Sequence, residues 1–333
     1  MDTSNAAGSG QGTGGRSRVV VGVDGSAGAR EALVQAFLAA ARRHADLDVV
    51  ASYLVDLYWT GGRPVDVPNV PALRDDTDAR ARALVQEVQE EVAGAGISGT
   101  GDLAVQLFIL AGPAAPALLE RAHGADLLVV GSRGRGAVRS ALLGSVALHC
   151  VAHAACTVLV VHSEAAGTPH PSKVIVGVDG STASRAALAA AIEEAGARGA
   201  DLDVVTTFEV TNYWADMASI EIPSVDEIDG ELHGRAERLV SEVVGSRSGG
   251  GPMPRIRTVV AQGPADEVLV QQGRNADLLV VGSRGRSEFR GLLLGSIALY
   301  TAMHATCPVM VVHPERGAAA DVSNGSEAAL AGR

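Results

Sequence analysis

The feature of the sequence that most restricts its fold is an internal duplication. The segment VVVGVDGSAGAREAL at 19–33 returns as VIVGVDGSTASRAAL at 174–188, an offset of 155 residues. ADLLVVGSRGR at 125–135 returns unchanged at 276–286, an offset of 151 residues. Copies of roughly 145 residues have the size of domains, whereas solenoid units run to about 20–50 residues. We therefore predict two domains that share one fold.

Composition predicts where the two copies end. The segment between them, SEAAGTPHPSK, carries two prolines and one glycine, which is typical of a linker. The first residues are rich in glycine and serine and offer no apolar pattern, which is typical of a disordered tail. We predict disordered tails at 1–17 and 314–333, domains at 18–162 and 173–313, and a linker at 163–172.

Each copy alternates short β-rich segments with segments of helical periodicity. In the first copy we expect strands at 18–23, 47–54, 103–109, 127–131 and 157–161. We expect helices at 30–43, 75–92, 113–122 and 145–154, the second with its acidic residues in the first turn, where the helix dipole favours them. Near-continuous apolar strands are buried on both faces, as in parallel sheets covered by helices. The predicted fold class is α/β, twice.

The composition of the 333-residue chain excludes several classes of partner. Its formal net charge of -11 opposes binding to nucleic acid or to an anionic membrane surface. No apolar run approaches the ~20 residues of a membrane span, and the first residues lack a secretory signal. Three cysteines argue against a disulfide framework and indicate a reducing compartment. We predict a cytoplasmic protein without nucleic-acid or membrane partners.

A glycine motif, Gly-x2-Gly-x9-Gly-Ser, follows the fourth predicted strand of each copy. The residues between its glycines differ while the spacing holds, which favours a geometric requirement over a flexible connector. Glycine lets a backbone approach a ligand closely, a serine can cap the next helix, and N–H groups at a helix start bind phosphate. The motif residues are Gly131, Gly134, Gly144 and Ser145, then Gly282, Gly285, Gly295 and Ser296.

Two familiar phosphate-binding motifs do not fit this loop. A P-loop needs a lysine before its Ser or Thr, and Lys173 is the only lysine in the chain. A Rossmann fingerprint would follow the first strand, where this chain reads VGVDGS.

One aspartate ends the first strand of each copy, Asp24 and Asp179. Ligands of open parallel sheets bind beyond these strand ends, where the strand order reverses. Because phosphates would repel a carboxylate, the aspartate would accept hydrogen bonds from a base or ribose at the other end of the ligand. Alternatively it caps the following helix or shapes the DGS turn.

The duplicated motifs resemble those of tandem universal stress proteins of the ATP-binding type, over residues 18–162 and 173–313. The resemblance implies an adenine-nucleotide α-hydrolase-like fold with a five-stranded parallel sheet of order 3-2-1-4-5 in each domain. It also implies ATP, with or without Mg²⁺, bound by the motif through its phosphates and ribose, with adenine against the aspartate and the end of the second strand. The site residues expected on this basis are Asp24, Ser52, Gly131, Arg133, Gly134, Gly144, Ser145 and Val146, then Asp179, Thr207, Gly282, Arg284, Gly285, Gly295, Ser296 and Ile297.

The sequence thus predicts a protein that binds one adenine nucleotide per domain and acts as a stress-responsive regulator or sensor, not an enzyme. An alternative is a slow ATPase or nucleotidyl-transfer enzyme of the same fold group. The chain has neither a HIGH-type nor a Ser-Gly-Gly-x-Asp-Ser signature, and no lysine in either loop to stabilise a departing pyrophosphate. The intact motifs disfavour a third alternative, a nucleotide-independent scaffold.

Some other patterns have a structural and a functional interpretation. We interpret the recurring histidines and cysteines as helix ends and small buried thiols rather than zinc ligands, which would have to converge tetrahedrally. Aromatic pairs after each second strand are expected to cover a core edge rather than adenine. Arg133, Arg135, Arg284 and Arg286 would either pair with phosphate or stay solvated, and segments 75–92 and 231–243 are interpreted as packing faces. The histidines, cysteines and aromatic pairs are His153, Cys156, His162, His304, Cys307, His313, Tyr58-Trp59 and Tyr213-Trp214.

Each copy ends in a short apolar strand, CTVLVVH at 156–162 and CPVMVVH at 307–313. In the order 3-2-1-4-5 this strand lies at a sheet edge, and an uncovered apolar edge invites aggregation. We therefore expect the two strands to pair antiparallel within the chain, as an internal pseudo-dimer, with a homodimer of whole chains as a further possibility.

Overall fold

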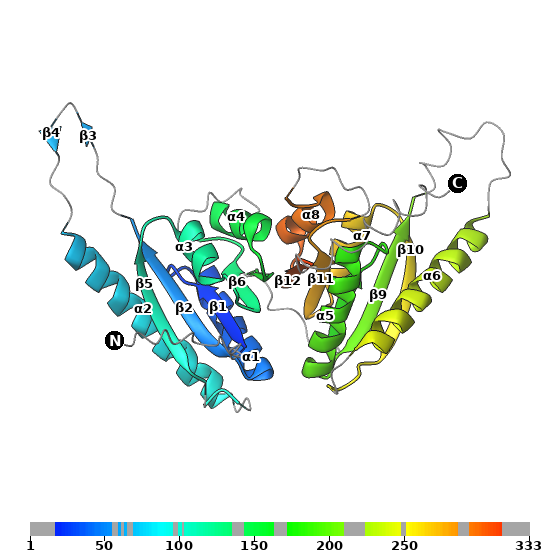
Figure 1. Cartoon of the computed structure of the whole chain (residues 1–333), viewed down its shortest axis with the longest axis horizontal. Coiled ribbons are helices and arrows are strands. Elements are labelled where there is room, and N and C mark those ends of the chain that lie inside the picture. The colour runs from blue at the N-terminus through cyan, green and yellow to red at the C-terminus, as the bar shows by residue number, and fades with distance from the viewer. Residues whose placement is uncertain are drawn as a thin grey trace, which may run out of the picture.

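The structure is a computed structural model that describes residues 17–54, 59–60, 63–64, 69–95, 99–101, 103–134, 143–162, 172–209, 224–247, 251–285 and 293–314. Most of the predicted tails and linker, and the residues Tyr58, Arg135, Tyr213, Trp214 and Arg286, lie outside these ranges. The described elements form two α/β repeats around one ten-stranded sheet of order β10-β9-β8-β11-β12-β7-β6-β1-β2-β5 (Figure 1).

The first repeat supplies half of this sheet, in the order β5-β2-β1-β6-β7. This is the predicted order 3-2-1-4-5, with β1 paired in parallel to both β2 and β6. Each predicted strand is present within a few residues, and the two-residue strands β3 and β4 were not predicted. The elements are β1 (Arg18–Gly22), α1 (Ala27–Arg43), β2 (Asp46–Tyr53), β3 (Trp59–Thr60), β4 (Arg63–Pro64), α2 (Val70–Gly94), β5 (Val105–Ala111), α3 (Ala114–Arg121), β6 (Leu127–Gly131), α4 (Ser145–His153) and β7 (Thr157–Val161).

The second repeat has the same order, β10-β9-β8-β11-β12. Its neighbouring strands are all parallel, so their carboxyl ends lie along one edge of the sheet. The elements are β8 (Lys173–Gly177), α5 (Thr182–Arg198), β9 (Asp201–Phe208), α6 (Val225–Ser246), β10 (Ile256–Gln262), α7 (Ala265–Gly273), β11 (Leu278–Gly282), α8 (Ser296–His304) and β12 (Val309–Val312).

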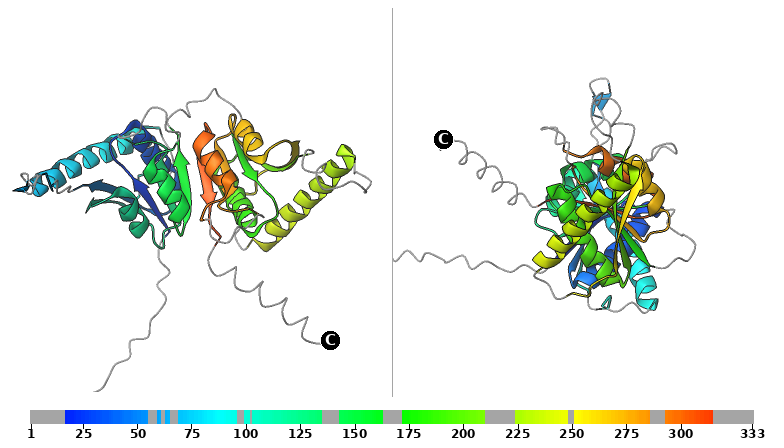
Figure 2. Two further views of the ribbon diagram at one scale, coloured as in Figure 1. Left: turned by 90° about the horizontal axis from the view of Figure 1, so that it is seen from above. Right: turned by 90° about the vertical axis from the view of Figure 1, so that its right-hand side faces the viewer.

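The two repeats join through their last strands, β7 and β12, which lie side by side at the centre of the molecule (Figure 2). They pair antiparallel, with Leu159 opposite Met310 and Val160 opposite Val309. This is the intrachain pairing expected from the sequence, and it covers two apolar edges that would otherwise be exposed.

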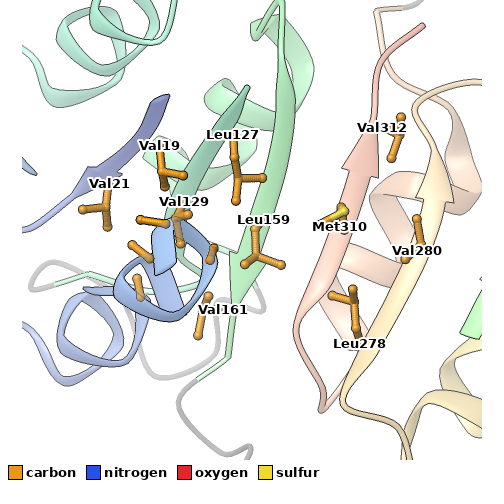
Figure 3. Close-up of a cluster of buried hydrophobic side chains, with 14 of the residues drawn as sticks. Val19, Val21, Leu127, Val129, Leu159, Val161, Leu278, Val280, Met310 and Val312 are labelled. Atoms are coloured by element: carbon orange, nitrogen blue, oxygen red, sulfur yellow. The ribbon is translucent and has the colours of Figure 1, made fainter. Parts of the chain in front are cut away.

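The core is divided by the sheet into two layers because successive strand residues point to opposite faces. Val19 and Val21 belong to the layer that also contains residues of α1, α2, α5 and α6, whereas Val20 belongs to the layer with residues of α3, α4, α7 and α8. The first layer is continuous across the join, since it contains both Leu159 of β7 and Met310 of β12, each 1% exposed (Figure 3). Helices thus cover both faces of the parallel half-sheet of each repeat, as predicted.

The start of α2 differs from the prediction. The helix begins at Val70 rather than near Asp75, because Asn69 caps it by accepting a hydrogen bond from Ala72 N at 3.3 Å. Its first turn therefore holds no acidic residue, and the expected interaction of those acids with the helix dipole is wrong. Two of them form ion pairs one turn further along, Asp76 with Arg80 and Asp78 with Arg82. No helix in the described part of the chain is both long and apolar enough to cross a membrane.

Candidate functional site

A cavity of about 680 Å³ opens at the carboxyl edge of the second half-sheet. Its walls come from the ends of β8, β9 and β11, the first turns of α5, α7 and α8, and one face of α6. Every site residue predicted for the second copy lines it: Asp179, Thr207, Gly282, Arg284, Gly285, Gly295, Ser296 and Ile297. The structure therefore gathers, in one place, residues that are up to 118 positions apart in the numbering of the chain.

The two ends of the glycine motif are tied to each other by backbone hydrogen bonds. Gly295 N donates to Ser283 O at 2.8 Å, and Ser283 N donates to Val312 O of β12 at 2.8 Å. The first repeat has the same pair of bonds, from Gly144 N to Ser132 O at 2.8 Å and from Ser132 N to Val161 O at 2.7 Å. The motif is therefore anchored to the sheet at both ends, as a geometric requirement would demand.

The first glycine of the motif is required by close packing against the opening turn of α1. A Cβ atom on Gly131 would lie 2.7 Å from the carbonyl carbon and oxygen of Gly28. In the second repeat, a Cβ atom on Gly282 would lie 2.7 Å from the carbonyl carbon of Ala183. No side chain fits at that separation, so glycine is needed here for the fold before any ligand is considered.

The serine of the motif does not cap the following helix. Gly144 and Gly295 are the N-cap residues of α4 and α8, and neither helix has a side-chain cap. Ser145 and Ser296 are instead the first helical residues, and both are exposed. The capping role expected for these serines is wrong. Because the first turns have no side-chain cap, their N–H groups are available as hydrogen-bond donors to an anionic ligand.

Asp24 and Asp179 each shape the turn that follows the first strand. Their Oδ1 atoms accept hydrogen bonds from Ser26 N and Ser181 N, both at 2.9 Å. The other carboxylate oxygen faces the glycine loop, since a Cβ atom on Gly134 would lie 2.6 Å from Asp24 Oδ2. The aspartate thus lies beside the loop rather than away from it, and the turn-forming interpretation is confirmed. Its contact with a base or ribose stays a prediction.

The end of the second strand also reaches the site. Thr207 of β9 lines the cavity together with Val205, whose carbonyl oxygen accepts from Val178 N at 2.9 Å. Ser52 has the corresponding place in β2, where it pairs with Leu110 of β5. These positions agree with the strand ends that the resemblance implied.

Part of the cavity wall was not predicted. Arg235, Arg238 and Glu242 of α6 line the cavity, although segment 231–243 was interpreted only as a packing face. That interpretation holds for Ala236 and Leu239 of the same helix, which are buried. The glycine motif carries no information on this wall, because α6 lies outside it in the sequence.

The helix that forms this wall has a counterpart in the first repeat. Arg185 of α5 pairs with Glu242 of α6 at 2.5 Å, and Arg30 of α1 pairs with Glu87 of α2 at 3.0 Å. Both pairs are 57 residues apart in sequence. Helices α2 and α6 are therefore joined to α1 and α5 by equivalent ion pairs.

The comparisons with known proteins agree with this geometry. The sequence profile of the universal stress protein family matches residues 15–162 and, a second time, residues 171–313. The chain belongs to the universal stress protein family. Universal stress protein Rv2005c of Mycobacterium tuberculosis is 35% identical over 300 residues, which cover 88% of this chain and 96% of that protein. Universal stress protein Rv2623 of the same organism is 32% identical over 296 residues, or 88% of this chain and 95% of that protein.

A solved universal stress protein also shares the arrangement of both repeats. The crystal structure of a universal stress protein from Archaeoglobus fulgidus matches with a TM-score of 0.60 over 89% of this chain and 98% of that chain. Its sequence identity is 16%, so the likeness concerns the fold.

The histidines near the ends of this universal stress protein's repeats bind backbone carbonyl groups. His162 Nε2 contacts Ala302 O at 3.0 Å, and His313 Nε2 contacts Val151 O at 3.1 Å, so each repeat reaches into the other. His153 and His304 contact carbonyls within their own helices at 2.9 Å. Across the described ranges, no three His, Cys, Asp or Glu side chains gather as a metal site would require.

We expect Gly131→Ala to destabilise the protein by about 1–3 kcal/mol, the usual cost of overpacking. The added methyl group would press on the Gly28 backbone at 2.7 Å, which α1 can relieve only by moving off the sheet. The matched control is Gly144→Ala, whose Cβ atom would lie 3.4 Å from its nearest neighbour, Ser132 O. Urea unfolding followed by circular dichroism should show the shift for Gly131→Ala, and equal midpoints for the two variants would contradict the packing role.

Proposed function

We propose that this universal stress protein binds ATP, one molecule in each repeat, and acts as a stress-responsive regulator or sensor rather than as an enzyme. The observation that carries the proposal is the cavity of the second repeat, which brings the glycine loop, the first-strand aspartate and the second-strand end together. Its residues provide both a polar surface for the phosphates and an apolar surface for the base of a nucleotide.

The cavity fits a nucleotide in size and in chemistry. Its volume of about 680 Å³ falls within the range of about 300–1,000 Å³ found for small-molecule sites. Arg284 and the uncapped first turn of α8 supply positive charge and N–H donors for phosphate oxygens. Leu232, Leu239 and Leu269 supply apolar wall for a base. Mg²⁺ bound with the phosphates would reduce their charge.

The first repeat supports a second site through equivalent contacts. Asp24 faces Gly134 as Asp179 faces Gly285, with the added Cβ atoms at 2.6 and 2.9 Å from the carboxylate oxygens. Gly144 N is tied to Ser132 O as Gly295 N is tied to Ser283 O. We therefore assign one nucleotide to each repeat.

Binding without turnover is proposed because the cavity's carboxylates already have structural partners. Of the described lining residues, Asp179 and Glu242 are the carboxylates, and they accept hydrogen bonds from Ser181 N and from Arg185. Because both carboxylates already have structural partners, we assign neither of them as a general base, a role that typically contributes about 10²–10⁴-fold. The proposed role is therefore that of a nucleotide-dependent regulator.

We also propose a cytoplasmic location and an internal rather than an obligatory external dimer. All three cysteines are free, which fits a reducing compartment. The apolar strands β7 and β12 cover each other within one chain, so no second chain is needed for that edge.

Isothermal calorimetry of the full chain with ATP tests the proposal. We expect saturation near two nucleotides per chain, one for each motif. Denaturing freshly purified protein and identifying any released nucleotide by chromatography provides an independent readout. Absence of saturable binding at millimolar ATP would overturn the proposed function.

A further inference from the structure

The two repeats differ in the charges that surround their sites. Four arginines and two carboxylates are among the described residues that line the cavity of the second repeat: Arg185, Arg235, Arg238, Arg284, Asp179 and Glu242. The question is whether the first repeat offers the same charges to a ligand.

The equivalent ion pairs give the correspondence between the helices α2 and α6. Because Arg30–Glu87 and Arg185–Glu242 have the same separation of 57 residues, positions on these helices correspond at an offset of 155. Arg238 then corresponds to Ala83, so the first repeat has no cation at this position.

The first repeat has more carboxylates around the arginine of this ion pair than the second repeat has. In the first repeat Arg30 is surrounded by three carboxylates, at 3.0 Å from Glu87, at 3.5 Å from Glu31, and in contact with Glu91. At the offset of 155, Glu31 and Glu91 correspond to alanine and serine in the second repeat, at positions 186 and 246.

Arg238 is the cation that distinguishes the second cavity. It is an exposed residue on the cavity wall and forms no ion pair with any residue in the described ranges. Its neighbours on that wall are occupied, since Arg235 pairs with Glu231 and Arg185 pairs with Glu242. The charge of Arg238 is therefore available to an anionic ligand in the cavity without displacement of a protein partner.

Resting on the proposed function, we propose that the two nucleotide sites are not equivalent and that Arg238 makes the second site selective for the more highly charged nucleotides. The first site, whose corresponding wall carries Ala83 in place of Arg238, discriminates less between ATP and adenosine. The tandem chain thereby combines a charge-selective site with a less selective one. Because Arg238 is exposed, its contribution falls as salt screens it, with a Debye length of about 10 Å at 0.1 M.

The test measures the affinities of ATP and adenosine at each site of the full chain, with the other site disabled. Gly144→Val leaves the second site for study, and Gly295→Val leaves the first. We expect the ratio of ATP affinity to adenosine affinity to be larger at the second site. In the Gly144→Val background, Arg238→Ala should lower this ratio by about fivefold at low salt, the size expected for one exposed charge pair.

Three matched variants separate the charge of Arg238 from other effects. Arg238→Lys should retain most of the selectivity. Arg235→Ala should lower the ratio less, because Arg235 is already neutralised by Glu231. Ala83→Arg, in the Gly295→Val background, should raise the ratio at the first site.

Equal ratios at the two sites, or an Arg238→Ala variant that weakens ATP and adenosine alike, would overturn the inference while leaving ATP binding itself intact. Failure of the unmodified chain to bind ATP at either site would instead refute the proposed function. Loss of the effect of Arg238→Ala at 0.5 M salt would support the inference, since screening removes an exposed charge interaction.

Discussion

Gly295→Val in the full chain is expected to weaken ATP binding at the second repeat by about 10²-fold and to leave one tightly bound nucleotide, at the first. Gly295 is the N-cap of α8, with φ -76° and ψ 153°, a conformation open to every residue. The branched side chain of the introduced valine would cover the first-turn N–H groups of α8, which have no side-chain cap. Losing two hydrogen bonds to charged phosphate at about 1.5 kcal/mol each corresponds to about 10²-fold in affinity.

The fold should tolerate this change better than the ligand does. A Cβ atom on Gly295 would lie 3.3 Å from Arg284 Cα and from Ser283 O, which is tight but not impossible. Calorimetry should therefore give one ATP per chain, with a melting temperature close to that of the parent protein. The equivalent variant of the first repeat, Gly144→Val, is the control and should weaken ATP binding at the first site instead. A Gly295→Val variant that still binds two nucleotides would refute the phosphate-binding role of the loop.

The fold and most of the candidate site were predictable because duplication reveals which residues obey a geometric rule. Gly131 and Gly282 occupy strand ends where a Cβ atom would collide with backbone 2.7 Å away. A requirement of this kind fixes one residue type at one spacing, whatever the loop between the glycines contains. The parallel sheet then places strands one and four side by side, which brings Asp24 against Gly134.

The contribution of α6 could not be predicted, because a helix wall does not depend on a fixed motif. Arg238 reaches the cavity through the placement of α6 on the sheet, and its counterpart is Ala83. The prediction that Ser145 caps α4 was wrong by one residue. The helix begins at that serine, so the capping position falls on Gly144.

A buried carboxylate between the repeats was also not anticipated, and its environment is strongly positive. Glu194 of α5 is 5% exposed. It pairs with Arg43 of α1 in the other repeat and accepts from Arg198 Nε at 3.0 Å. Burial and the neighbouring charge of Arg198 lower the pKa of Arg42 to about 10. At the offset of 155, Glu194 corresponds to Ala39, so only the second repeat has a carboxylate at this position.

Glu194→Gln is expected to destabilise the protein by about 3–5 kcal/mol, the usual cost of removing one partner from a buried ion pair. The glutamine would leave three guanidinium groups close together without a described countercharge. Urea unfolding at pH 7 measures the loss. The matched control is Glu87→Gln, because the Glu87 side chain is 60% exposed in its pair with Arg30 and loss of its charge should cost about 0–1 kcal/mol.

The same variant predicts how stability depends on pH. Burial acts to raise the pKa of Glu194, but the charges of Arg43, Arg198 and Arg42 outweigh it and hold that pKa below its ordinary value of 4.5. A carboxyl group with a lowered pKa in the folded state stabilises the fold above its unfolded pKa and loses this contribution as the pH falls. The difference in unfolding free energy between the parent protein and Glu194→Gln should therefore be constant above pH 6 and shrink below about pH 4.5. A difference that stays unchanged down to pH 3 would mean that the hydrogen-bonding geometry of the side chain, and not its charge, stabilises the contact between the two repeats at this point.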